Sequence, residues 1–181
     1  MIRFLLLLAF LTFLGLLSQL YLPALPWFPC AFVFLGAIFY FYSCLVLPFP
    51  AVLLFTFLFG LTTDFLTLPN AAESGFPCGG SILAFLVPAL IIHGFRPLTA
   101  KSTWLIPLAL APLVALLIPL TLVTQYGFLC LERREFFFNH AIMWRILGPG
   151  LAALVVAPGV FLVAGTLGRL VGYRPKRPRL G

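Results

Sequence analysis

The stretch from Ala51 to Leu68 is an apolar run about as long as a bilayer is thick, and it holds one acidic residue, Asp64. A bilayer core takes about 20 helical residues. On a helix at roughly 100° per residue, the small and polar residues of this run share one narrow face. These seam residues are Thr56, Gly60, Thr63, Asp64 and Thr67. Because lipid does not solvate polar groups, we expect the seam to face other protein.

Comparable apolar runs fill most of the chain. Its 181 residues are 63% hydrophobic and 8% charged, with a mean hydropathy of +1.18. A soluble domain of this size carries about 25% charged residues, so this chain lacks the side chains for a water-facing surface. We predict an all-α integral membrane protein, a bundle of about six transmembrane helices. Residues 1–172 would form one transmembrane domain, and residues 173–181 a basic cytoplasmic tail.

The prolines and glycines set the expected helix boundaries. The expected spans are Phe4–Leu22, Cys30–Leu47, Ala51–Leu68, Gly80–Phe95, Trp104–Gln125 and a long last span from near His140 to Val171. The first run also suits a signal peptide, but it lacks a small-x-small cleavage site, which favours a retained helix. Several spans carry internal prolines and are expected to be bent. The last span is expected to tilt, or to break at residues 148–150 or at Pro158.

The connections between the spans have distinct compositions. Pro48 and Pro50 predict a very tight turn, so that the second and third spans form an antiparallel hairpin. The segment Asn70–Gly79 is typical of an irregular loop. The segment Tyr126–Phe138 has a charged centre between aromatic residues, which predicts an outer interfacial stretch. It would be either a partner contact or a self-paired solvated loop.

The distribution of cations predicts the orientation. Six spans place both termini on the same side (N-in/C-in), and that side then holds eight cations: Arg3, Arg96, Lys101, Arg169, Arg174, Lys176, Arg177 and Arg179. The other side holds three: Arg133, Arg134 and Arg145. By the positive-inside rule the termini are cytoplasmic. Because the cations flank apolar spans, they indicate a membrane topology and not nucleic-acid binding.

Asp64 is the one intramembrane carboxylate, and its isolation would cost about 2.5 to 3.5 kcal/mol on insertion scales. Such a carboxylate is protonated, hydrated or paired, and we expect a partner at matched depth, first Arg145 and second His140. His93 is excluded because it lies near the opposite face of the membrane. No other arrangement typical of a catalytic site occurs, so we expect no enzyme activity and no cofactor. The spacing of the four cysteines makes no metal motif; Cys78 and Cys130 are either ordinary apolar thiols or an outer disulfide.

The aromatic cluster Phe39–Tyr42 allows two interpretations. It could form a wall on which a ligand stacks. The pattern favours the simpler alternative, an interfacial aromatic belt in contact with lipid.

The order of these features resembles the MreD family of rod-shape-determining membrane proteins of bacteria. The sequence Phe59–Leu66 is similar to the family's Gly-x-x-x-Asp-Leu-Leu pattern, which matches Gly60 and Asp64. Residues Pro77–Gly79 match its Pro-x-Gly, and a long last span and a basic tail follow. The resemblance covers most of the chain.

The resemblance implies a multi-pass protein of the bacterial cytoplasmic (inner) membrane that acts in cell shape and lateral wall elongation. Its partners would be an MreC-like membrane-anchored periplasmic protein and a glycosyltransferase/transpeptidase complex. The implied fold is similar to that of the substrate-binding subunits of energy-coupling-factor vitamin transporters. Such a transporter subunit is the alternative function. It would need several converging polar groups in an outward pocket and a small-residue docking face, for which Ala9 and Gly15 offer only a weak candidate.

Overall fold

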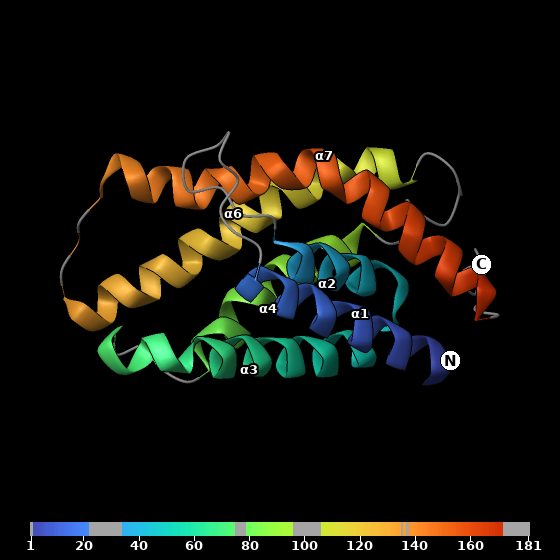
Figure 1. Cartoon of the computed structure of the whole chain (residues 1–181), viewed down its shortest axis with the longest axis horizontal. Helices are drawn as coiled ribbons and strands as arrows, with labels where there is room; N and C mark the ends of the chain where they lie inside the picture. The colour runs from blue at the N-terminus through green and yellow to red at the C-terminus, as the bar shows by residue number, and fades with distance from the viewer. Residues whose placement is uncertain are drawn as a thin grey trace.

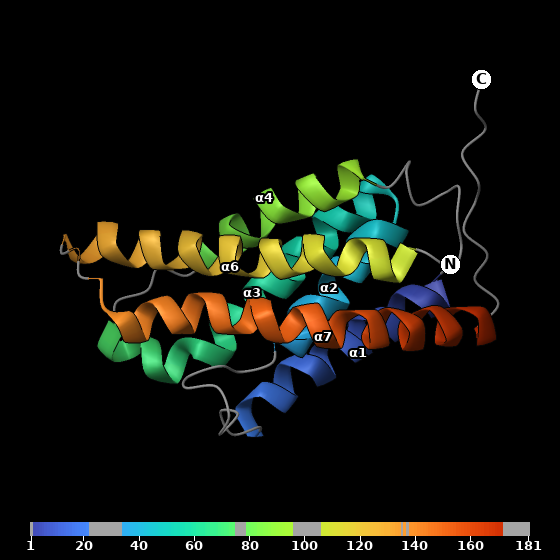
Figure 2. The ribbon, with the colours of Figure 1, turned by 90° about the horizontal axis from the view of Figure 1, so that it is seen from above.

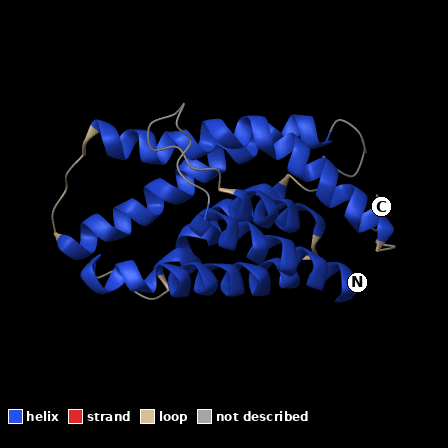
Figure 3. Ribbon diagram, in the orientation of Figure 1, coloured by secondary structure: helices blue, strands red, loops and turns tan. Residues whose placement is uncertain are grey.

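The computed structural model describes residues 2–21, 34–74, 79–95, 106–134, 136 and 138–171, and the regular structure in these ranges is all helical (Figure 3). The described helices are α1 (Ile2–Tyr21), α2 (Leu35–Val46), α3 (Phe49–Ser74), α4 (Gly80–Gly94), α6 (Ile106–Arg133) and α7 (His140–Leu170). The expected all-α class is confirmed. The basic tail lies outside the described residues.

Consecutive helices run in opposite directions along the bundle (Figures 1 and 2). The start of α1 and the end of α7 therefore lie at one end, here named the terminal end, and the opposite end is named the far end. The short helix α2 contacts each of the other described helices and lies at the centre of the bundle. The most extensive pairs around it are α6 with α7, α1 with α2, and α3 with α4.

Helix length divides the bundle into two groups. The helices α3, α6 and α7 each contain an apolar stretch that is long enough to cross a membrane: Phe49–Leu66, Ala109–Leu131 and His140–Leu170. The other described helices are apolar but have shorter stretches. At 12 and 15 residues, α2 and α4 extend only about 18 and 22 Å, less than a hydrocarbon core of about 30 Å. The fold is therefore that of a membrane protein with three helices of spanning length.

The hairpin between α2 and α3 has the tight turn that the prolines predict. Leu47 leaves the helix with an extended backbone (φ −77°, ψ 152°), which the clash with a following proline ring favours. Its N–H still donates to Ser43 O at 2.9 Å, and α3 begins two residues later at Phe49. Pro50 then occupies the first turn of α3, where the missing N–H has no intrahelical partner to lose.

Two helices extend further than the sequence pattern predicts, and a third keeps its predicted length without a break. Helix α3 continues through Pro69 to Ser74, and α6 continues through Tyr126 to Arg133, so both expected loops are partly helical. Helix α7 is unbroken across Pro149 and Pro158, although it bends toward its C-terminal end (Figure 1). Proline and polar composition predicted breaks, but a proline inside an apolar helix removes only one backbone hydrogen bond, which neighbouring groups replace.

The aromatic cluster of α2 belongs to the core. Tyr40 and Phe41 are 0% exposed, so the interpretation that the cluster is a lipid-facing belt is wrong for these two residues. The Tyr40 ring stacks on Phe59 of α3, with centroids 4.6 Å apart and an interplanar angle of 9°. It meets Phe85 of α4 edge-on at 5.4 Å. The rings therefore join three helices.

Helices α1 and α2 cross at paired glycines. A Cβ atom added to Gly15 would lie 2.8 Å from the backbone nitrogen of Gly36. This close approach explains why Gly15 is a glycine: the small face that it contributes is covered by α2 of the same chain. Gly15 is therefore not available to dock a second subunit.

Candidate functional site

The polar seam of α3 faces the inside of the bundle, as its spacing predicts. Thr56 and Asp64 are 1% and 4% exposed, and Gly60 is buried against Ile82 of α4. The large side chains on the other side of the helix are exposed: Leu54, Phe57, Leu58 and Phe65. Thr63 is half-buried and donates its hydroxyl proton to Phe59 O at 2.8 Å, within its own helix. The side chain of Thr67 is not among those that the structure describes.

Asp64 caps the N-terminus of α4. Its Oδ2 accepts a hydrogen bond from the backbone N–H of Gly79 at 2.6 Å. Gly79 is the N-cap residue of α4 and has a left-handed φ of 101°, which glycine adopts without a Cβ penalty. The first N–H groups of a helix lack intrahelical partners, and the helix dipole favours a negative charge there. The carboxylate is therefore compensated by a helix end.

The structure does not bring Asp64 together with either of its two predicted partners. Arg145 is exposed on α7, and no ion pair joins Arg145 to Asp64 in the part of the chain that the structure describes. His140 is also exposed, and its Nε2 accepts a hydrogen bond from Trp144 Nε1 at 3.1 Å within α7. Depth in the membrane was the basis of the prediction, and depth does not specify neighbours: α3 packs on α4, whereas α7 packs on α6.

A second polar contact, which the sequence analysis missed, lies at the same end of α4. Ser81 is 2% exposed, and its hydroxyl oxygen accepts a hydrogen bond from Gln125 Nε2 of α6 at 3.1 Å. Helix α4 is thus held at its start by α3 through Asp64 and by α6 through Gln125. A glutamine near the end of an apolar span was the available signal, because a buried amide needs a partner.

The buried hydroxyl of Tyr40 links three helices at the centre of the bundle. It lies 2.7 Å from Thr56 Oγ1 of α3 and 3.2 Å from the backbone oxygen of Phe85 in α4. Thr56 Oγ1 also lies 2.8 Å from Val52 O. The two hydroxyl protons are shared among three contacts: with Thr56 donating to Val52 O, the Tyr40 proton goes either to Thr56 Oγ1 or to Phe85 O. Both hydroxyls thus have protein partners without water.

His93 performs the capping role at the terminal end. Its Nδ1 lies 3.0 Å from the backbone oxygen of Cys44 in the last turn of α2. A carbonyl oxygen only accepts, so Nδ1 carries the proton in this contact. The carbonyl needs such a donor because the residue four positions later is Pro48, which has no N–H. As predicted, His93 and Asp64 are separated, since they lie at opposite ends of α4.

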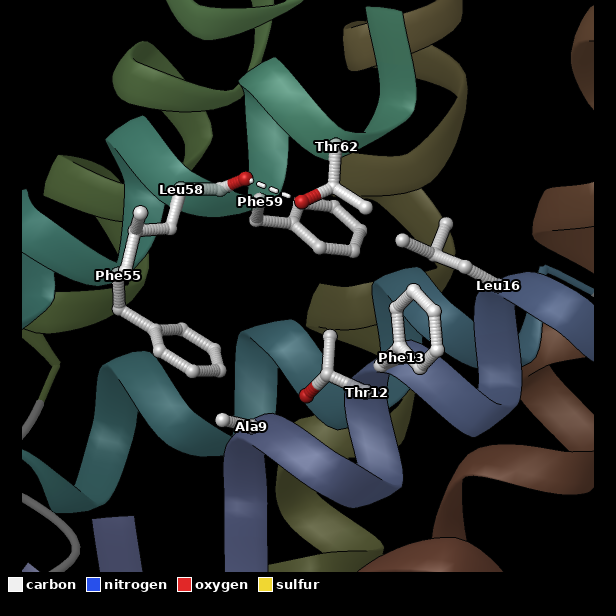
Figure 4. Close-up of a pocket in the computed structure, with 8 residues that line it drawn as sticks. All are labelled: Ala9, Thr12, Phe13, Leu16, Phe55, Leu58, Phe59 and Thr62. Atoms are coloured by element: carbon white, nitrogen blue, oxygen red, sulfur yellow. Dashed lines mark hydrogen bonds between the residues drawn. The ribbon is translucent and has the colours of Figure 1, made fainter. Parts of the chain in front are cut away.

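An apolar groove separates α1 from α3 (Figure 4). Its volume is about 260 Å³, and its lining residues come from these two helices: Ala9, Thr12, Phe13, Leu16, Phe55, Leu58, Phe59 and Thr62. Both threonine hydroxyls donate back to their own helix, Thr12 to Leu8 O and Thr62 to Leu58 O, each at 2.7 Å. The groove therefore offers carbon surfaces and no unused hydroxyl proton.

The thiols and metal-ligating side chains form no cluster within the described ranges. Cys44 is buried and Cys130 is half-buried, and both are free thiols. Cys78, the other half of the disulfide alternative, lies outside the described residues. No group of three or more His, Cys, Asp or Glu side chains converges among the residues that were placed.

Together these features define the class of protein as an all-helical membrane protein whose buried polar groups join helices to one another. Comparisons of the chain with protein-family models, with curated proteins and with solved structures give no match.

We expect removal of the Asp64 carboxylate to destabilise the bundle by about 1.5–3 kcal/mol, the worth of a hydrogen bond to a charged group. Asp64→Ala leaves the Gly79 N–H without this acceptor, whereas Asp64→Asn keeps an acceptor oxygen and should lose less. The measurement is the thermal unfolding midpoint in detergent. Thr62→Ala, two residues away with a hydroxyl bonded only within α3, is the matched control. Equal midpoints for Asp64→Ala and Thr62→Ala would contradict the capping role.

Loss of the His93 donor should cost about 1 kcal/mol, because the Cys44 carbonyl is left without its cross-helix partner. His93→Ala removes the donor, while His93→Asn can place an amide N–H where Nδ1 lies. Denaturant unfolding in detergent should therefore rank the variants as wild type, Asn, then Ala. If Asn and Ala lose the same stability, the ring serves packing against Phe49 and not the hydrogen bond.

Proposed function

We propose that the chain is a non-enzymatic scaffold or regulator of lateral cell-wall elongation in the bacterial cytoplasmic membrane, of the type that the MreD family represents. In this role it binds an MreC-like partner, and through it the wall-synthesis enzymes. The observation that carries the proposal is the hydrogen bond between Asp64 and Gly79. It joins the two motifs on which the resemblance rests, Gly-x-x-x-Asp in α3 and Pro-x-Gly before α4.

The contacts that the residues of the two motifs make support a structural role for these motifs. Gly60 lets α4 approach the α3 backbone, since an added Cβ would lie 2.6 Å from Ile82 Cα. Asp64, one helical turn later, then reaches the start of α4. Gly60 and Asp64 together hold α3 and α4 in a fixed relative position. A fixed helix pair is suited to a rigid binding surface rather than to a catalytic centre.

The proposal includes six membrane passes with both termini in the cytoplasm. It is supported by the shared position of the start of α1 and the end of α7 (Figures 1 and 2), and by the excess of cations in the segments at that end. The short helices α2 and α4 would cross within the bundle, where α3, α6 and α7 shield their ends from lipid.

The alternative, a vitamin-binding transporter subunit, predicts a pocket with converging polar groups. The groove between α1 and α3 does not supply them, because its two hydroxyls donate to Leu8 O and Leu58 O. The polar side chains Asp64, Gln125 and Ser81 are used in helix-to-helix contacts. These observations favour the scaffold.

The test is affinity purification of the tagged full chain from native bacterial membranes, followed by identification of the proteins that co-purify. We expect an MreC-like membrane-anchored periplasmic protein with a glycosyltransferase or transpeptidase. The control is an unrelated multi-pass protein with the same tag, which should recover neither. Recovery of a pair of ATPases with a transmembrane coupling subunit would overturn the scaffold in favour of the transporter.

A further inference from the structure

The groove between α1 and α3 has the chemistry of a lipid-chain site. The two helices that line it, α1 and α3, each pack on α2 and make little direct contact with each other. Figure 4 shows the rings of Phe13 and Phe55 and the side chain of Leu16 along its length. Because the two threonine hydroxyls are turned back to their own helices, a polar ligand would gain no hydroxyl donor here.

The volume of the groove is sufficient for an apolar occupant. The groove holds about 260 Å³. An apolar cavity of roughly 150 Å³ accepts a benzene molecule, so this groove has room for part of a flexible hydrocarbon chain.

The depth of the groove matches one leaflet of a bilayer. Arg3 is exposed at the terminal end of α1. The groove begins at Ala9 and ends at Leu16, which lie about 9 and 20 Å along the helix from Arg3. Half of the hydrocarbon core is about 15 Å thick. A lipid whose phosphate lies beside Arg3 would therefore have its chain at the level of the groove.

The charge at the terminal end of α1, about two helical turns before the groove, favours an anionic headgroup. Gly168 of α7 packs against Phe4, where an added Cβ would lie 2.8 Å from the Phe4 ring. This contact brings the exposed Arg169 to the same corner of the bundle as Arg3. The first acidic residue of the chain is Asp64, which lies toward the far end and cannot neutralise this corner.

We propose that the groove between α1 and α3 binds one acyl chain of an anionic phospholipid of the adjacent leaflet, and that Arg3, with Arg169, binds its phosphate. The site depends on the membrane location of the chain and not on the wall-elongation partner. Failure of the proposed function would therefore leave this inference standing, and the reverse also holds.

The experiment is native mass spectrometry of the full chain, purified in mild detergent and equilibrated with phosphatidylglycerol or phosphatidylethanolamine. We expect wild type to retain one phosphatidylglycerol. Ala9→Phe and Thr62→Phe fill the groove from opposite walls, and each should abolish most of this retention. Arg3→Gln should lower the preference for phosphatidylglycerol about fivefold, the effect of one cation near an anionic surface.

Two matched controls separate the site from general lipid contact. Val155→Phe adds the same bulk on an exposed position of α7, and Arg145→Gln removes an exposed cation near the far end. Neither should change retention. Unchanged retention in a groove variant that elutes as a single species overturns the proposal, as does equal loss in Val155→Phe. A protein that co-purifies with wild type and is displaced by Ala9→Phe overturns it in favour of a docked polypeptide. An unaltered lipid preference in Arg3→Gln overturns the headgroup assignment.

Discussion

Gly60→Ala is expected to destabilise the bundle by roughly 1–3 kcal/mol, at the upper end of this range, because the added methyl group has nowhere to go. It would lie 2.6 Å from Ile82 Cα and 2.8 Å from Ile82 N. Backbone atoms cannot move aside as a flexible side chain can, so α3 and α4 must separate. The separation would also lengthen the hydrogen bond from Gly79 to Asp64, one turn further along α3.

The control for this prediction is Gly159→Ala in α7. Gly159 is also inside a helix, but no atom lies within 4 Å of an added Cβ. Both substitutions gain the same helix propensity, up to about 1 kcal/mol, so the difference between them isolates the packing cost. Thermal unfolding in detergent should show a lower midpoint for Gly60→Ala and an equal or higher midpoint for Gly159→Ala. Matching midpoints would show that α3 and α4 do not depend on this close approach.

The sequence predicted the direction of the α3 seam but not what the seam meets. Spacing along one helix places Thr56, Gly60 and Asp64 on one face, and the structure confirms that this face is buried. Which helix covers that face depends on the packing of all the others. Arg145 was a reasonable partner by depth, but α7 lies against α6. The true partner, the backbone N–H of Gly79, carries no side-chain signal.

The core position of Tyr40 could not be predicted because α2 lacks the contrast between polar exposed positions and apolar buried positions. In a soluble protein, polar residues mark the exposed face of a helix. In α2 the half-buried and buried positions are nearly all apolar or aromatic, so periodicity does not separate the buried Tyr40 and Phe41 from the half-buried Phe39 and Tyr42. The hydroxyl was the usable signal, because a tyrosine inside an apolar span needs a hydrogen-bond partner.

The cross-helix polar contacts follow one physical rule. Lipid offers no hydrogen bonds, so each helix end and each buried polar side chain needs a partner from the protein. Asp64 serves the start of α4, His93 serves the end of α2, and Tyr40 bonds to the middle of α4. The polar side chains inside the apolar spans therefore act as contacts between helices.

Tyr40→Ala is expected to be the most damaging substitution, with a loss of about 3–5 kcal/mol, the range for deleting a buried aromatic side chain. The ring is fully buried at the centre of the bundle and contacts Phe59 and Phe85 on two other helices. Its removal leaves a cavity that α2, which a tight turn joins to α3, cannot close by shifting. Denaturant unfolding in detergent measures the loss.

Tyr40→Phe separates the ring from the hydroxyl. It keeps both aromatic contacts and removes the hydroxyl that contacts Thr56 and Phe85 O, which should cost about 0.5–1.5 kcal/mol. In this variant the contact between the two hydroxyls is already lost, and Thr56 bonds only to Val52 O within its own helix. A Tyr40→Phe/Thr56→Val double variant should therefore lose little more stability than Tyr40→Phe alone. A loss in Tyr40→Phe as large as that in Tyr40→Ala would mean that the hydroxyl, and not the packing of the ring, holds α2 to α3 and α4.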